Sequence, residues 1–132
     1  MTAEKSVVRT ERAPAPFQGA PYSQAIRVGD LVFVSGQLAL RPGESELMGG
    51  SIQEQTAQVL ANMGAILEEA GSGLDRLVKT TVFLADLGDF AGMNEVYAQH
   101  VGDRPPARST VEVAALPSGA LVEIEAIALC SS

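Results

Sequence analysis

The sequence has very few of the residues that build disulfides and metal sites. Its 132 residues include one cysteine, Cys130, and one histidine, His100. A single thiol cannot form an internal disulfide or a multi-thiolate metal site, and a free cysteine in an apolar strand is typically a small buried side chain. His100 has no ligand-like companion and there is no aspartate-rich loop. We therefore expect no metal site.

Positive charge and long apolar runs are also scarce. Nine Lys and Arg residues face sixteen Asp and Glu residues, giving a net charge of -7, and the basic residues do not cluster. Because phosphate neutralisation dominates most nucleic-acid binding, this balance argues against nucleic-acid partners and anionic membranes. The N-terminus has no apolar signal-like stretch, and no later window has the apolar length of a membrane span. We expect a soluble, cytoplasmic protein.

Three common active-site motifs are missing as well. Gly49-Gly50 and Gly71-Ser72-Gly73 match neither a phosphate-binding loop nor a dinucleotide-binding fingerprint. Ser35 does not follow the nucleophile-elbow pattern, and only His100 is available as its base. The lack of a nucleophile elbow and of a second candidate base argues against a serine hydrolase.

The patterns that are present predict one domain over residues 1–132, with residues 1–8 as a loosely ordered N-terminal extension in which a short strand could begin at residue 6. A capping box at Ser51 and Glu54 begins a helix that Gly71 ends, and Asp89 is placed to cap a second helix that Gly102 ends. Alternating or buried runs predict strands over 31–38, 78–84, 109–114 and 120–129. The order predicts an α+β fold: a single mixed β-sheet with two α-helices packed on one face. The other face then needs a cover, which favours an oligomer.

The strongest candidate site residue is Arg108, which stands at the entrance of the strand over 109–114. Its planar guanidinium can bind a carboxylate through two parallel hydrogen bonds. A turn over 116–119 predicts that the flanking strands are antiparallel neighbours, which would bring Glu123 near Arg108. The two could form a surface ion pair, or Arg108 could fix an anionic substrate while Glu123 orients water or moves a proton.

Other candidates are polar residues at turns and element ends. Tyr22, Ser35 and Asn94 can each face a pocket or cap a backbone group. Gly36, inside the strand over 31–38, indicates a β-bulge or a close backbone approach.

Taken together, these segments resemble the RidA/YjgF family, also called the endoribonuclease L-PSP family, from Arg9 to Leu129. The resemblance includes the segment from Pro106 to Val113 and the segments 21–26, 34–37, 54–56, 78–84, 93–97 and 122–128. It implies a chorismate-mutase-like fold, a homotrimer with clefts between subunits, and no cofactor. It also implies hydrolysis of 2-enamines and 2-imines, such as 2-aminoacrylate and 2-iminopropionate, to 2-keto acids and ammonia.

The resemblance assigns roles to the candidate residues. Arg108 would bind the substrate carboxylate, Glu123 would position or activate water, and backbone groups at Gly36 and Thr110 would frame the ligand. Tyr22, Ser35 and Asn94 match further pocket positions, with Tyr22 supplied to the Arg108 site by the adjacent subunit.

Three other functions stay open. The chain could be a non-catalytic trimer that binds a small metabolite or regulates a partner enzyme, or an endoribonuclease or translation inhibitor. A chorismate mutase rests on fold analogy alone.

Overall fold

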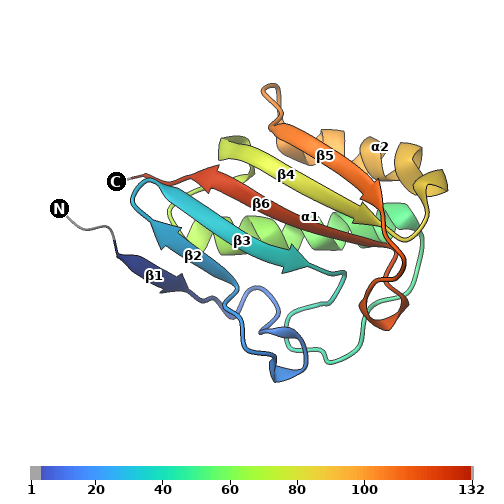
Figure 1. The fold of residues 1–132 in the computed structure, drawn as a ribbon, viewed down its shortest axis with the longest axis horizontal. Helices are drawn as coiled ribbons and strands as arrows, with labels where there is room; N and C mark the ends of the chain where they lie inside the picture. The colour runs from blue at the N-terminus through green and yellow to red at the C-terminus, as the bar shows by residue number, and fades with distance from the viewer. Residues whose placement is uncertain (1–3, 132) are drawn as a thin grey trace.

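Six strands form one sheet, and both α-helices pack on one of its faces (Figure 1). The computed structural model describes residues 4–131. The elements are β1 (Lys5–Val8), β2 (Ala25–Val28), β3 (Leu31–Gln37), α1 (Ile52–Glu69), β4 (Leu77–Leu84), α2 (Phe90–Val101), β5 (Ala107–Glu112) and β6 (Val122–Leu129). The pairing of β4 with β5 is parallel and every other pairing is antiparallel. The predicted α+β architecture is confirmed.

The sheet order is β1-β2-β3-β6-β4-β5, so β6 lies between β3 and β4. The prediction that β5 and β6 are antiparallel neighbours is wrong, because β4 separates them. Burial explains this placement: one face of β6 consists of Val122, Ile124, Ala126 and Ala128, which are all buried, whereas β5 has no buried residue. The more apolar strand lies at the centre of the sheet, and the polar strand forms its edge.

The sequence analysis missed β2, which forms a hairpin with β3. Val28 of β2 pairs with Leu31 of β3 across the two-residue turn Gly29-Asp30, where Gly29 has φ 59°. β1 pairs along β2. Residues 5–8, expected to belong to a loosely ordered extension, thus form the edge of the sheet. Residues 1–3 lie outside the described part of the chain.

The helix boundaries follow the predicted signals with one exception. The Ser51 hydroxyl accepts from Glu54 N and the Glu54 carboxylate accepts from Ser51 N, which is the expected capping box. Gly71 and Gly102, past the ends of α1 and α2, have φ values of 81° and 78°. The Asp89 side chain makes no capping hydrogen bond. Instead, a 3-10 turn over Leu87–Asp89 leads into α2.

The core lies between the helices and the sheet, and it is lined by α1, α2 and the even-numbered residues of β6. Among residues 4–131, no helix is long and apolar enough to cross a membrane. The opposite face of the sheet has no helix over it (Figure 1). Its exposed apolar side chains include Leu31, Phe33, Val111 and Leu129.

Candidate functional site

A pocket of about 590 Å³ lies where β3 ends and β6 begins. Four of the predicted site residues line it: Tyr22, Ser35, Gly36 and Glu123. Much of the remaining wall is apolar, and it includes Phe17, Leu38 and Leu40. The pocket therefore combines two carboxylates, those of Glu123 and Glu125, with an apolar lining, as many small-molecule sites combine a few polar groups with apolar walls.

Glu123 is held against Gly36. The pairing of β3 with β6 shifts register between Val34 and Gln37, so Gly36 lies in an irregularity of the strand. A Cβ atom added to Gly36 would lie 2.5 Å from Oε2 of Glu123 and 2.8 Å from its Cδ. Only glycine leaves room for the carboxylate in this position. The predicted close approach at Gly36 is confirmed.

The electrostatic surroundings of Glu123 favour its neutral form. Burial raises the pKa of the Glu123 carboxyl above its ordinary value, and the negative charge of Glu125 raises it further. Glu125 lies two residues along β6 and points to the same face of the sheet. A carboxyl whose pKa is raised toward neutral pH is better suited to accept and return a proton.

Ser35 and Tyr22 are tied into the pocket wall. The Ser35 hydroxyl donates to Ser23 O at 2.6 Å, and Ser35 N donates to Gln24 O at 3.0 Å. The Tyr22 hydroxyl accepts from Phe17 N at 2.5 Å. Because its proton is held by a carbonyl, Ser35 supports the segment that carries Tyr22 and is not poised as a nucleophile.

Gln24 lines the pocket, and the sequence analysis did not include it among the candidate site residues. Its side chain is buried, accepts from Thr10 N at 2.8 Å, and donates to Thr10 O at 3.0 Å and Pro14 O at 2.8 Å. It therefore fixes the Thr10–Pro14 segment, which leads into the part of the wall formed by Ala15 and Phe17. The available signal was a glutamine directly before the apolar residues of β2.

Arg108, Asn94 and Thr110 lie away from this pocket. The Arg108 guanidinium stacks on α2, with its carbon 4.8 Å from the ring centre of Tyr97 and 5.5 Å from that of Phe90. The Tyr97 ring is fixed by a 2.6 Å hydrogen bond between its hydroxyl and that of Thr80. No ion pair among residues 4–131 includes Arg108. The oriented, unpaired cation is suited to binding an anion.

Asn94 and Thr110 are placed around this cation. Asn94 lies one helical turn from both Phe90 and Tyr97 and is partly buried. Thr110 follows Arg108 by two residues, so both side chains leave β5 on the same face. The Thr110 Oγ1 atom is buried and has no hydrogen-bond partner among residues 4–131.

Arg108 and Glu123 point to opposite faces of the sheet. Arg108 is opposite Thr80 and Glu123 is opposite Phe83 on the intervening strand β4, an odd number of residues apart. With strands ~4.8 Å apart and ~3.3 Å per residue along each strand, the two Cα atoms are separated by about 14 Å. The structure thus divides the predicted site into two groups. Tyr22, Ser35, Gly36 and Glu123 form one, and Asn94, Arg108 and Thr110 form the other.

The described residues contain no cluster of three or more His, Cys, Asp or Glu side chains that could hold a metal ion. His100 uses its Nδ1 atom in a 2.9 Å hydrogen bond with Val96 O. The two groups of predicted site residues present one carboxyl, one guanidinium and several hydrogen-bonding groups.

Comparison with known proteins places the chain in a family. The Endoribonuclease L-PSP family model matches residues 10–130. A RutC family protein of Pyrococcus abyssi is 53% identical over 94% of this chain and 96% of its own length. The mouse 2-iminobutanoate/2-iminopropanoate deaminase is 45% identical over 95% of this chain and 91% of its own length. The crystal structure of Escherichia coli TdcF with bound serine matches with a TM-score of 0.87 and 41% identity, covering 96% of this chain and 99% of that chain. The chain therefore belongs to the RidA/YjgF family of imine deaminases, described by the Endoribonuclease L-PSP model.

Proposed function

We propose that this protein hydrolyses 2-imino and 2-enamino carboxylates, such as 2-iminopropanoate and 2-iminobutanoate, to 2-keto acids and ammonia. The observation that carries the proposal is the Glu123 carboxyl, held over Gly36 in a pocket with its pKa raised by burial. The mouse relative named for this activity adds support.

The active site is completed between subunits of a homotrimer. One chain presents an unpaired guanidinium on one face of its sheet and a carboxyl-containing pocket on the other. A neighbouring subunit packed against the open face would bring its Arg108, Asn94 and Thr110 to the pocket that holds Glu123 and Tyr22. The exposed Leu31, Phe33 and Leu129 side chains on this face support such packing.

The chemistry needs only a bound substrate and one proton carrier. Arg108 binds the carboxylate and fixes C2 of the substrate near Glu123. Water adds to C2 of the protonated imine while Glu123 accepts its proton, and a tetrahedral amino alcohol forms. Glu123 passes this proton to the nitrogen. The C–N bond then breaks as Glu123 takes the hydroxyl proton, so that ammonia leaves and the C2–O bond becomes the ketone carbonyl. Proton transfer of this kind contributes roughly 10²–10⁴-fold to the rate.

A coupled assay tests the proposal. An amino-acid oxidase generates 2-iminopropanoate, and semicarbazide traps the imine that has not been hydrolysed. We expect the parent protein and Arg104→Ala, which removes an exposed arginine four residues upstream, to lower semicarbazone formation, and Arg108→Ala to have no effect. An Arg108→Ala variant as active as the parent would refute the assigned role. Saturable binding of 2-oxobutanoate without turnover would instead support a metabolite-binding trimer.

The family model's description also raises RNA cleavage. The net charge of -7 and the single histidine, whose Nδ1 atom is bonded to Val96 O, both weigh against it.

A further inference from the structure

The apolar wall of the Glu123 pocket is formed by a segment that has left the sheet. The pairing of β3 with β6 ends at Gln37 and Ile124, and Leu38 and Leu40, which follow directly, line the pocket. Both side chains are buried. Backbone groups buried outside a sheet need other partners, so something else must satisfy this segment.

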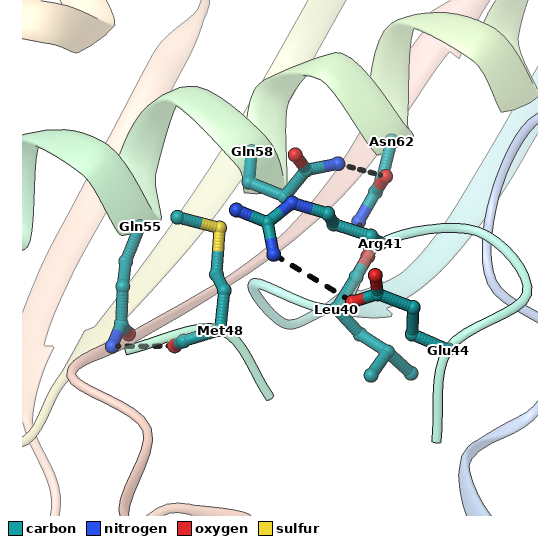
Figure 2. A network of polar contacts seen from close by, with 7 residues as sticks. All are labelled: Leu40, Arg41, Glu44, Met48, Gln55, Gln58 and Asn62. Carbon is teal, nitrogen blue, oxygen red and sulfur yellow. Dashed lines mark hydrogen bonds and ion pairs between the residues drawn. The ribbon is translucent and has the colours of Figure 1, made fainter. Parts of the chain in front are cut away.

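Asn62 of α1 supplies those partners. Its amide nitrogen donates to Leu38 O at 3.1 Å and to Leu40 O at 2.8 Å, and its amide oxygen accepts from Gln58 Nε2 at 2.9 Å. Because carbonyl oxygens only accept hydrogen bonds, the nitrogen must face them. The Asn62 side chain is 1% exposed, so no water competes for these bonds. Figure 2 shows Asn62 and Gln58 on α1 beside the segment that begins at Leu40.

A second amide, two turns earlier on α1, fixes the rest of the loop. Gln55 accepts from Leu121 N at 3.0 Å and donates to Met48 O at 3.4 Å. Met48 N in turn donates to Ala39 O at 3.0 Å. Gln55 thus joins the loop to Leu121, which directly precedes β6 and stands two residues before Glu123. Figure 2 shows the bond from Gln55 to Met48. Helix α1 therefore makes hydrogen bonds both to the Leu38–Leu40 wall and to the backbone two residues before Glu123.

We propose that Asn62 is a positioning residue that sets how long a side chain the pocket accepts, by holding the Leu38–Leu40 wall in place. The proposal rests on the proposed function in assigning 2-imino acids and their 2-keto acid products to this pocket. Without the amide donor, Leu40 O loses its hydrogen-bond partner, and Leu38 O keeps only the bond from Leu40 N. The segment then moves outward toward water, and the pocket widens at its apolar side.

The test compares two 2-keto acids that differ only in their side chain, which is ethyl in 2-oxobutanoate and the longer, branched isobutyl in 4-methyl-2-oxopentanoate. Dissociation constants are measured by calorimetry for the parent, Asn62→Leu and Ile66→Ala, and kcat/KM is measured for the corresponding imines. Ile66→Ala opens a core cavity on the same helix and removes no hydrogen bond to the wall, so it controls for loss of stability. For Asn62→Leu, we expect the ratio of the two dissociation constants, and the ratio of the two kcat/KM values, to shift by about 10-fold in favour of the longer ligand. This is the low end of what an apolar pocket gains per methylene. Ile66→Ala is expected to keep the parent ratio.

An unchanged ratio in Asn62→Leu, or an equal shift in Ile66→Ala, would overturn the proposal. If Asn62→Leu does not fold, Gln58→Leu replaces it, because Gln58 orients the Asn62 amide; it should give a smaller shift in the same direction, and no shift would count against the proposal.

A parent that binds the keto acids without turnover would refute the deaminase function and leave the binding ratio as the test of Asn62. If the parent neither binds nor hydrolyses the probes, hydrogen exchange decides: Asn62→Leu should speed exchange at Met48 N and not at Ser35 N, and unchanged exchange at Met48 overturns the positioning role.

Discussion

Arg108 and Glu123 lie about 14 Å apart at their Cα atoms and on opposite faces of one sheet, so a single chain cannot bring them to one substrate. If both are needed for hydrolysis, each active site takes Arg108 from one subunit and Glu123 from its neighbour. Two variants, Arg108→Ala and Glu123→Gln, should then each be inactive as pure proteins. A mixture of the two should regain activity, because some sites combine the intact residue of each.

The expected yield follows from counting. In an equal mixture of randomly assembled subunits, half of the chains carry Arg108 and the other half carry Glu123. A site that takes the two residues from different chains is intact in about one quarter of cases. If both residues came from one chain, no site would be intact.

The assay mixes the two variants in urea, refolds them by dilution, and measures semicarbazone suppression at equal total protein. Parent protein mixed with the Arg108→Ala/Glu123→Gln double variant serves as the matched control. It should give about one quarter of parent activity for shared sites but about one half for sites within one chain. Zero activity in the first mixture, together with one half in the second, would refute the shared site.

Three further predictions concern the pocket within one chain. Gly36→Ala should lower kcat by about 10²-fold, because the new methyl displaces the Glu123 carboxylate, while the thermal midpoint changes little because that carboxylate ends a flexible side chain; an equal loss of stability would contradict this. Gln24→Leu leaves the Thr10 and Pro14 backbone groups without partners and should lower the free energy of unfolding by about 3 kcal/mol in urea titrations. The pKa of the Glu123 carboxyl is raised by burial and then by Glu125. The stability that this carboxyl contributes is therefore fully present at pH values below its ordinary pKa of 4.5, and it is lost as the pH rises through the raised pKa. Glu123→Gln in the Arg108→Ala background should therefore raise the urea midpoint at neutral pH and leave it unchanged well below pH 4.5; a lower midpoint at neutral pH would show that the charge is stabilised.

Local signals in the sequence predicted the helices and most strands because those signals act over a few residues. The capping box at Ser51 and the glycines at 71 and 102 each fix a helix boundary through neighbouring backbone groups. The predicted turn over 116–119 is present before β6, and Ser118 within it has φ 55°. A turn shows where a strand begins but not which strand it pairs with, and here β6 passes to the centre of the sheet. The error about β5 and β6 arose at this step.

The candidate site was only partly predictable for the same reason. Glu123, Gly36 and Arg108 were found from strand patterns and from the resemblance, but their division between two faces follows from the position of β4. Gln24 and Asn62 were missed because a buried amide looks like any polar residue until its partners are known. One signal was present at Asn62, since it stands beside Met63 on the apolar side of α1.

The two kinds of polar residue differ in where their partners lie. Gln24 and Asn62 are satisfied within one chain, so the shape of the pocket is fixed by folding alone. Among residues 4–131, no ion pair includes Arg108, which stacks on aromatic rings, or Glu123, which is partly buried beside Glu125. Both charges would gain a partner when subunits and substrate come together, since the guanidinium lacks an anion and the carboxyl lacks a cation. If the site is shared between subunits as proposed, the unpaired guanidinium of one chain would favour the binding of an anionic imine beside the carboxyl of its neighbour.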